Sequence, residues 1–241
     1  MSYLGTNEIG KMYLGSVEIA KAYLGDTLVY SQGGAPAPPG DLSRYIQDGL
    51  VMHLDGINKG ETSGRWSSLV GTAYCALTTH SESKDDHVLM DGNGCLTVTN
   101  AVTTGYTSGT IEVVCDNIGG GNCIIYYGLS SKFAFIYSPN GYGFGIASSN
   151  NQWNITKETL FTASANADRF MLNGVAGGTK GTNSWTAVSS TTIGGRAGSA
   201  SHYYANAKIY SIRIYSKKLT EAEMLNNQKV DNARFNLGLN I

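Results

Sequence analysis

The feature that most constrains the fold is the spacing of short apolar runs from residue 42 onward. These runs are rich in Ile, Val, Tyr and Phe, and they alternate with turn residues such as Gly, Asn and Ser. Such spacing is typical of a β-sandwich, and the 31 Gly and 15 Tyr of the 241-residue chain suit short strands joined by tight turns. The segments that we expect to be strands are 50–54, 94–98, 109–115, 123–129, 133–137, 143–147, 159–163, 169–172, 191–193 and 207–215.

Two of these segments carry detailed signals. Alternation in the 109–115 run places Ile111, Val113 and Cys115 on one face, which we expect to be the core face. Asn173-Gly174 follows an apolar run and is a strong two-residue hairpin signal, because both positions of such a turn need positive φ.

The last predicted strand, 207–215, is the clearest. Simple alternation there places Tyr210, Ile212 and Ile214 on one face and the intervening residues on the other.

One helix is expected after that strand. Thr220 can cap its N-terminus, and Glu223 at the third helical position completes a capping box. The helix should end near Ala233, and we expect Phe235 and Leu237 to fold back onto the sandwich.

Several blocks of this sequence resemble the laminin-G-like domains of bacteria and phages, which belong to the concanavalin A-like group. The most specific block is 207–227 with Asp231, Arg234 and Phe235, which is similar to the closing strand and helix of that family. Weaker likenesses are Asp48-Gly49-Leu50-Val51, Leu54-Asp55-Gly56, Trp66-Ser67-Ser68-Leu69-Val70-Gly71, Arg169-Phe170-Met171-Leu172-Asn173-Gly174 and Ile193-Gly194-Gly195-Arg196. The resemblance covers about residues 42–236. It implies an all-β fold, a two-sheet antiparallel jelly-roll β-sandwich with one short C-terminal helix, and a fold that usually binds and rarely catalyses.

A ten-residue repeat occupies the N-terminus, where Tyr-Leu-Gly recurs at 3–5, 13–15 and 23–25. A unit of this length suits a strand plus a turn, and about thirty residues cannot bury a Tyr/Leu stripe alone. We therefore expect residues 1–34 to form a small β-repeat arm for anchoring or oligomerisation. An extra hairpin packed on the main domain is the alternative. The anchoring contacts are expected from Tyr3, Leu4, Tyr13, Leu14, Tyr23 and Leu24.

A Gly/Pro linker at residues 35–41 separates this arm from the sandwich domain, residues 42–241. Tyr-Leu-Gly decapeptides ahead of such a linker resemble the arms of virion proteins from tailed phages of gut bacteria. That resemblance implies that the arm attaches to a particle or trimerises, while the lectin-like domain projects outward.

The net charge and the hydropathy of the chain limit the kinds of partner that it can bind. The net charge is −1, so we expect no nucleic acid to bind, and no run approaches the roughly 18 apolar residues of a membrane helix. The first residues lack a basic region followed by an apolar core, so no signal peptide is expected and synthesis should occur in the host cytoplasm.

The sequence gives no sign of a known catalytic pattern. Sandwiches that cut β-glucans carry a Glu-x-Asp-x-x-Glu strand, whereas Glu112 and Asp116 here would lie roughly 13 Å apart. No triad or zinc spacing involves the four histidines. We therefore expect no enzyme, no catalytic residues, no resident metal and no cofactor. A calcium loop at 85–87 is the alternative to a solvated loop there.

Sugar recognition needs exposed aromatic side chains beside amides or carboxylates. Trp66 matches a buried family position and is expected in the core. The aromatic residues expected in polar loops, where they could stack on a sugar ring, are Trp153, Trp185, Tyr142, His202 and Tyr203.

Together these features predict a virion structural protein, a head or tail fibre or a capsid-decoration subunit. It would be homotrimeric, attached to other virion proteins through its arm, and its projecting domain would bind host-surface glycans. The alternatives are a bacterial carbohydrate-binding module, a polysaccharide depolymerase with an unfamiliar active site, and a purely architectural protein. Which glycan it would bind is left open.

Overall fold

The computed structural model describes residues 3–4, 7–8, 13–14, 17–18, 21–24, 27–31, 42–60, 62–100, 109–120, 123–127, 133–138, 142–146, 160–166, 169–177, 191–195 and 204–241. For 3–31 and 123–146 the description is of the backbone. The chain divides into two compact units, Met1–Arg44 and Tyr45–Ile241.

The described strands of the first unit form three separate two-stranded antiparallel hairpins, one for each repeat. They are β1 (Tyr3–Leu4) with β2 (Asn7–Glu8), β3 (Tyr13–Leu14) with β4 (Val17–Glu18), and β5 (Lys21–Leu24) with β6 (Thr27–Ser31). The ten-residue period therefore corresponds to one hairpin per unit, with two short strands where the sequence predicted a strand plus a turn.

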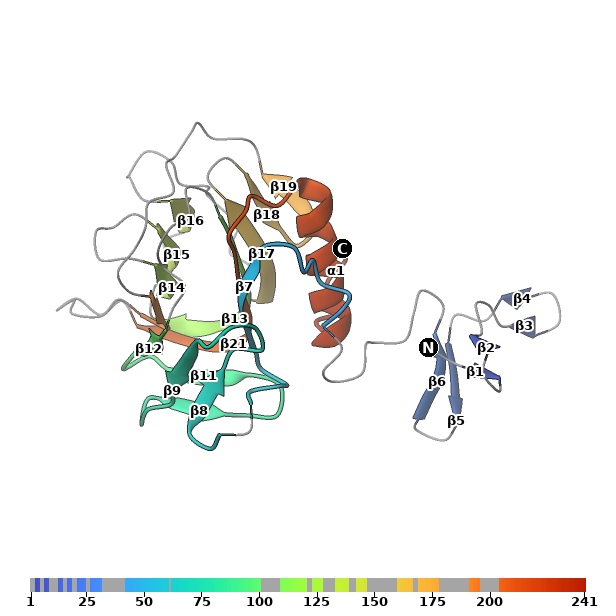
Figure 1. Ribbon diagram of the computed structural model, residues 1–241, viewed down its shortest axis with the longest axis horizontal. Helices are drawn as coiled ribbons and strands as arrows, with labels where there is room; N and C mark the ends of the chain where they lie inside the picture. Colours follow the sequence, from blue (N-terminus) through green and yellow to red (C-terminus); the bar gives the residue numbers. More distant parts are fainter. Residues whose placement is uncertain are drawn as a thin grey trace. The chain divides into compact units, whose positions relative to one another are not determined.

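The second unit consists of two antiparallel sheets, which confirms the predicted β-sandwich (Figure 1). In the described residues, the eight-stranded sheet has the order β10 (Ser81–Ser83), β11 (Val88–Asp91), β21 (Ala205–Tyr215), β13 (Thr110–Gly120), β17 (Leu160–Asn166), β18 (Phe170–Leu172) and β19 (Val175–Gly177). Its eighth strand, β7 (Leu50–Asp55), pairs with β21 along the edge that β11 also uses. The seven-stranded sheet has the order β16 (Tyr142–Ile146), β15 (Phe133–Ser138), β14 (Cys123–Tyr127), β20 (Thr191–Ile193), β12 (Leu96–Thr99), β9 (Tyr74–Ala76) and β8 (Arg65–Ser67).

Five of these strands, β8, β9, β10, β11 and β19, lie outside the predicted segments. Each has three or four residues, and Ser81–Ser83 contains no apolar residue at all. Strands this short contain too few residues to show alternation, so local pattern does not detect them; ladder pairing and the burial of side chains such as Trp66 and Cys75 stabilise them instead.

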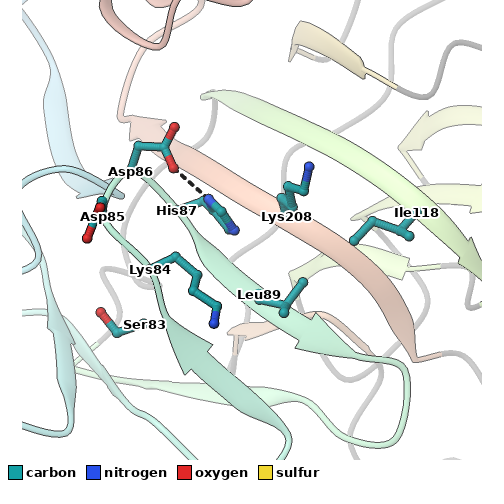
Figure 2. Close-up of a pocket in the computed structure, with 8 residues that line it drawn as sticks. All are labelled: Ser83, Lys84, Asp85, Asp86, His87, Leu89, Ile118 and Lys208. Atoms are coloured by element: carbon teal, nitrogen blue, oxygen red, sulfur yellow. Dashed lines mark hydrogen bonds and ion pairs between the residues drawn. The ribbon is translucent and has the colours of Figure 1, made fainter.

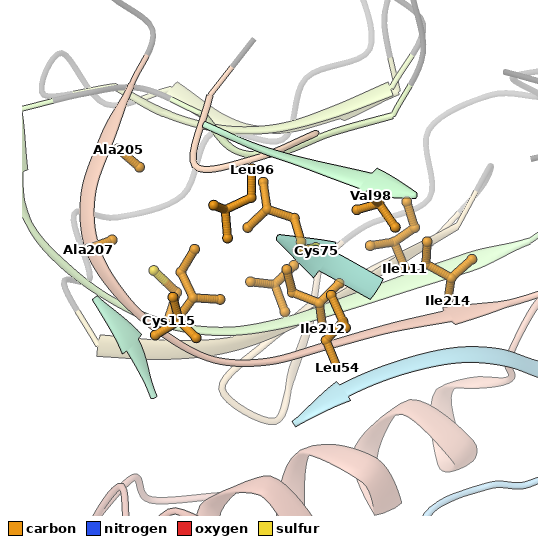
Figure 3. Packing of buried hydrophobic residues seen from close by; sticks show 14 of the residues in the cluster. Leu54, Cys75, Leu96, Val98, Ile111, Cys115, Ala205, Ala207, Ile212 and Ile214 are labelled. Atoms are coloured by element: carbon orange, nitrogen blue, oxygen red, sulfur yellow. The ribbon is translucent and has the colours of Figure 1, made fainter. Parts of the chain in front are cut away.

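The main hydrophobic core lies between the sheets (Figure 3). Ile111, Val113 and Cys115 point into it, as alternation predicted. Trp66 is fully buried, and its indole Nε1 donates to the Asp55 carbonyl oxygen at 2.9 Å, which confirms its predicted place in the core. Burial of such a side chain contributes roughly 2–3 kcal/mol.

Helix α1 (Glu221–Arg234) covers the outer face of the eight-stranded sheet beside β17 and β18 (Figure 1). The predicted capping box is present: the Thr220 hydroxyl accepts from the Glu223 backbone N–H, and the Glu223 carboxylate accepts from the Thr220 N–H at 2.7 Å. Within the described chain, no helix has the length and apolar character needed to cross a membrane.

The strand β21 departs from simple alternation at one point. Its pairing with β13 shifts register so that Val114 faces Ser211 while Cys115 faces Ile209, and Tyr210 is the extra residue of a β-bulge. The prediction that Tyr210 shares a face with Ile212 was therefore wrong. Ile209 and Ile212 point into the main core, whereas Tyr210 packs outside it.

On that outer face, Tyr210 meets the segment that follows the helix. Phe235 and Leu237 pack with Val114 and Tyr210 in a small apolar cluster, which confirms that they fold back onto the sandwich. The Phe235 and Tyr210 rings lie 5.6 Å apart between centroids.

A buried charged network fixes α1 to the sheet. Arg213 on β21 donates through Nε to Glu112 Oε2 at 2.8 Å, and through Nη1 and Nη2 to both carboxylate oxygens of Asp231 on α1, at 2.7 and 2.6 Å. The Tyr45 ring covers the guanidinium at 4.3 Å. All of these side chains are nearly inaccessible to solvent, so this network determines how the helix sits and offers no surface to a ligand.

Candidate functional site

The structure does not describe the side chains of the loop aromatics predicted to contact sugar. Trp153, Trp185, His202 and Tyr203 lie outside the described residues. Tyr142 opens β16, and its side chain is also outside the description. The six anchoring residues, Tyr3, Leu4, Tyr13, Leu14, Tyr23 and Leu24, lie in β1, β3 and β5, where only the backbone is described.

The candidate site in the described part of the second unit is a groove of about 490 Å³ on the outer face of the eight-stranded sheet (Figure 2). It is built from the β10–β11 turn and from neighbouring positions on β11, β21 and β13. The residues that line it are Ser83, Lys84, Asp85, Asp86, His87, Leu89, Ile118 and Lys208.

The floor of this groove follows from strand register. Leu89 on β11 pairs with Lys208 on β21, and Lys208 pairs in turn with Asp116 on β13. Paired residues of adjacent strands project to the same face, so these three side chains form one outward row. Within the row, Lys208 Nζ donates to Asp116 Oδ2 at 3.2 Å.

A second β-bulge places Ile118 at the groove. The β13–β21 pairing passes from Asn117 opposite Ala207 to Gly119 opposite Asn206, which leaves Ile118 as the extra residue. A bulge re-aims the side chain of its extra residue. Ile118 is 51% exposed, and it lines the groove together with the half-buried Leu89.

The rim of the groove is the four-residue turn between Ser83 and Val88, which face each other across the hairpin. The Lys84 N–H donates to the His87 carbonyl oxygen at 3.0 Å and closes the turn. His87 Nδ1 lies 2.6 Å from Asp86 Oδ1, and its ring lies against the Tyr210 ring at 5.4 Å. The Tyr210 bulge thus supports the rim from below.

Two residues that follow β7 hold this rim in place. Gly56 approaches the turn so closely that a Cβ there would lie 2.2 Å from the Asp86 carbonyl oxygen. Lys59 donates through Nζ to the carbonyl oxygens of Gly56 and Lys84 and, at 3.4 Å, of Asp85. Contacts with Gly56 and Lys59, which lie outside the turn, therefore fix the position of the turn backbone.

The lysine side chains around the groove all have oxygen partners. The Lys84 ammonium pairs with Glu82, and that of Lys208 pairs with Asp116. Burial lowers the pKa of Lys59, although the nearby carboxylates Asp55, Asp86 and Asp85 raise it in part. Burial, with the charges of Asp86 and Asp116, also raises the pKa of Tyr210 to about 12, so its hydroxyl stays protonated.

His53 is a buried group with no role in the groove. It is fully buried on β7, stacks edge-on against Tyr45 at 5.1 Å and lies 3.3 Å from the Ser211 hydroxyl. Burial and the charge of Arg213 lower its pKa to about 3, so the ring is neutral at physiological pH. This agrees with the interpretation of His53 as a packed side chain.

Sequence reasoning missed most of the groove. Asp85, Asp86 and His87 were visible as a polar cluster, but they were assigned to a solvated loop with calcium as the alternative. No group of three or more His, Cys, Asp or Glu in the described residues is arranged to hold a metal ion. Leu89, Lys208 and Ile118 carry no local signal, because only strand register brings them together.

The fold and the site define a jelly-roll β-sandwich protein with a surface groove. Neither a protein-family model nor a curated protein matches the sequence. The fold is similar to that of Trypanosoma rangeli sialidase in complex with 2,3-difluorosialic acid, with a TM-score of 0.57 and 14% identity over 74% of this chain and 32% of that one. It is also similar to the receptor-binding domain of botulinum neurotoxin D, with a TM-score of 0.56 and 10% identity over 76% of this chain and 53% of that one.

This chain therefore spans about a third of the sialidase and about half of the toxin chain. At such low identity, the likeness shows the fold alone.

The expectation that the chain is not an enzyme requires correction. The similar structures include sialidases, which are enzymes, among them one in complex with sialic acid and one described as a covalent intermediate. The expectation rested on the absence of a β-glucanase carboxylate pattern and of any triad or zinc spacing, and Glu112 is fully buried against Arg213. The absence of these patterns does not exclude activity from a fold that enzymes also contain.

Proposed function

We propose that the second unit is a lectin-like module that binds host-surface glycans, and that the N-terminal repeats anchor it to a phage particle as part of a fibre or capsid-decoration protein. The observation that carries the glycan-binding part is the composition of the groove. Hydrogen-bonding side chains of both signs stand at its rim, beside the apolar side chains of the half-buried Leu89 and the exposed Ile118.

A sugar ring presents the complementary chemistry. Its hydroxyls both donate and accept hydrogen bonds, and one or both of its faces expose C–H groups. Carboxylates such as Asp85 and Asp86 accept from hydroxyls, and the Lys208 ammonium donates. The groove is open and shallow enough that single-site affinity should be weak, which many copies on one particle would compensate through avidity.

The repeat arm supports the anchoring part. Its three hairpins do not pair with one another in the described strands. An isolated two-stranded hairpin is at best marginally stable in water, so three or more strands or a packing partner are needed. Other virion proteins, or the arms of two further copies in a homotrimer, would supply that partner.

Binding of the full chain to a glycan array tests the first part. We expect a restricted set of glycans to bind, and we expect this binding to fall in a variant that carries Asp86→Ala, Ile118→Ser and Lys208→Ala. An absence of binding to every glycan, with the protein folded by circular dichroism, contradicts the proposal. Bound glycans should also be assayed for release of reducing ends, which reports any cleavage.

Sedimentation of the full chain tests the arm. We expect an oligomer, with a trimer favoured, and its dissociation when Leu4, Leu14 and Leu24 are replaced by Asp. Identical assembly of this variant and the wild type would remove the role assigned to the arm.

A further inference from the structure

We infer that the groove accepts an uncharged pyranose, a neutral hexose or N-acetylhexosamine, and rejects sugars that carry a carboxylate. This inference rests on the proposed glycan-binding function and specifies its ligand class. It follows from three properties of the groove. Its lysine ammonium groups already have oxygen partners, its rim carboxylates can still accept hydrogen bonds, and a β-bulge exposes an apolar side chain in it.

The ammonium groups at the groove are already engaged. Lys84 contacts Glu82, Lys208 Nζ lies 3.2 Å from Asp116 Oδ2, and Lys59 donates to backbone carbonyls. A carboxylate on the ligand would therefore share a cation that already has an oxygen partner, and would not neutralise a lone charge. Its electrostatic gain would be smaller than at an unpaired cation.

Unpaired negative charge remains at the rim. Among the described residues, no hydrogen bond or ion pair engages the Asp85 carboxylate, and Asp86 uses one oxygen, Oδ1, to contact His87. Four carboxylates, those of Glu82, Asp85, Asp86 and Asp116, stand against three ammonium groups around the groove. A like charge brought to this rim is repelled, whereas a hydroxyl donor is attracted.

The apolar part of the groove suits the C–H face of a ring. Ile118 is 51% exposed because it is the extra residue of a bulge, and without that bulge β13 would pair regularly across this position. Leu89 lies in the outward row on β11, and both side chains line the same groove (Figure 2). A pyranose whose hydroxyls meet Asp85 and Asp86 could cover these two side chains with its apolar face.

Matched pairs of methyl glycosides test this inference, because each pair differs only at C6. Binding of the full chain should be measured by saturation-transfer NMR and calorimetry with methyl glucoside against methyl glucuronide, and methyl galactoside against methyl galacturonide. We expect at least one neutral glycoside to bind about tenfold or more tightly than its acidic partner. Its affinity should change little between 50 and 500 mM salt, because no net charge is neutralised.

Two groups of variants locate the site. Ile118→Ser should weaken neutral-sugar binding by about tenfold, the loss expected when a side chain of this size no longer buries its apolar surface. Val175→Ser is the matched control, because Val175 is also exposed, at 70%, but lies on β19 at the other end of the sheet. The double variant Asp85→Asn/Asp86→Asn removes two negative charges from the rim. It should therefore reduce the ratio of the affinity for the neutral glycoside to that for its acidic partner.

The outcomes separate this inference from the function on which it rests. If glycans bind the full chain but Ile118→Ser and Val175→Ser behave alike, the groove is not the site, although glycan binding stands. Equal or tighter binding of the acidic glycosides overturns the assigned ligand class. If neither neutral nor acidic glycosides bind and no glycan on the array binds, the proposed glycan-binding function and the ligand class inferred here are both wrong.

Discussion

Replacement of Arg213 by Met should strongly destabilise the sandwich. In the folded chain this guanidinium is 1% exposed and forms hydrogen bonds to Glu112 and to both oxygens of Asp231. Met fills much of the same volume but donates nothing. Two buried carboxylates would then face each other and the Tyr45 ring with no cation between them.

The magnitude follows from the cost of breaking a buried ion pair from one side. Removal of one partner of such a pair costs about 3–5 kcal/mol, because the remaining charge stays desolvated. A domain of this kind is stable by roughly 5–15 kcal/mol in total. With a urea m-value of about 2 kcal/mol per M, a loss of about 4 kcal/mol moves the unfolding midpoint down by roughly 2 M.

The loss should depend on pH in a defined direction. Burial raises the pKa of Glu112 above its ordinary value of 4.5, while the charge of Arg213 lowers it in part. A carboxyl with a raised folded-state pKa contributes stability that is complete below the unfolded value and is lost as pH rises through the folded one. Without Arg213 the pKa of Glu112 rises further, so the difference between variant and wild type should be smaller at pH 5 than at pH 8.

Urea unfolding followed by tryptophan fluorescence measures this effect in the full chain, because the three tryptophans, Trp66, Trp153 and Trp185, all lie beyond the arm. Arg169→Met is the matched control: Arg169 pairs with Glu221 at 2.8 Å, but these side chains are 42% and 54% exposed. An exposed pair is worth at most about 1 kcal/mol. If Arg213→Met costs no more than Arg169→Met, the buried network does not hold the helix.

Further predictions concern single positions. Thr220→Ala should cost about 1 kcal/mol in urea unfolding, through loss of the helix cap. Gly174→Ala should cost about 2 kcal/mol and more than Gly64→Ala: both have positive φ, but only the Gly174 Cβ would meet another residue, at 2.7 Å from Ile241 Cγ2. Burial raises the pKa of Cys75 to about 12, so peptide mapping after iodoacetamide at pH 8 should find this thiol alkylated only in urea.

Features encoded within a few residues were predictable from the sequence. Thr220 and Glu223 define the helix start by themselves, since both partners of the capping box lie in one turn. Asn173 and Gly174 adopt the positive φ values, 48° and 79°, that their hairpin signal required. In each case the interaction that stabilises the structure is local, so the sequence contains all of it.

Features that depend on pairing between distant strands were not predictable in this way. The bulges at Tyr210 and Ile118 arise from a mismatch in register between β13 and β21, about 90 residues apart in the chain. Nothing within either strand marks the extra residue. One bulge places Ile118 in the groove, and the other places Tyr210 against His87 at its rim. The groove was therefore not predictable from the sequence, for the same reason that the bulges were not.

Arg213 and Asp231 illustrate a second limit. Charged residues on the outer face of a sheet are ordinarily solvated, and only the docking of α1 turns that face into an interior. The helix was predictable, but the surface on which it would lie was not.

The position of β21 has a consequence for synthesis. This strand, Ala205–Tyr215, follows every other described strand in the chain, yet it lies inside its sheet between β13 on one side and β7 and β11 on the other. A nascent chain therefore holds β7 and β11 without this ladder partner until Ala205–Tyr215 has emerged from the ribosome. The N-terminal repeats precede all of these strands, so they emerge well before the sandwich can close.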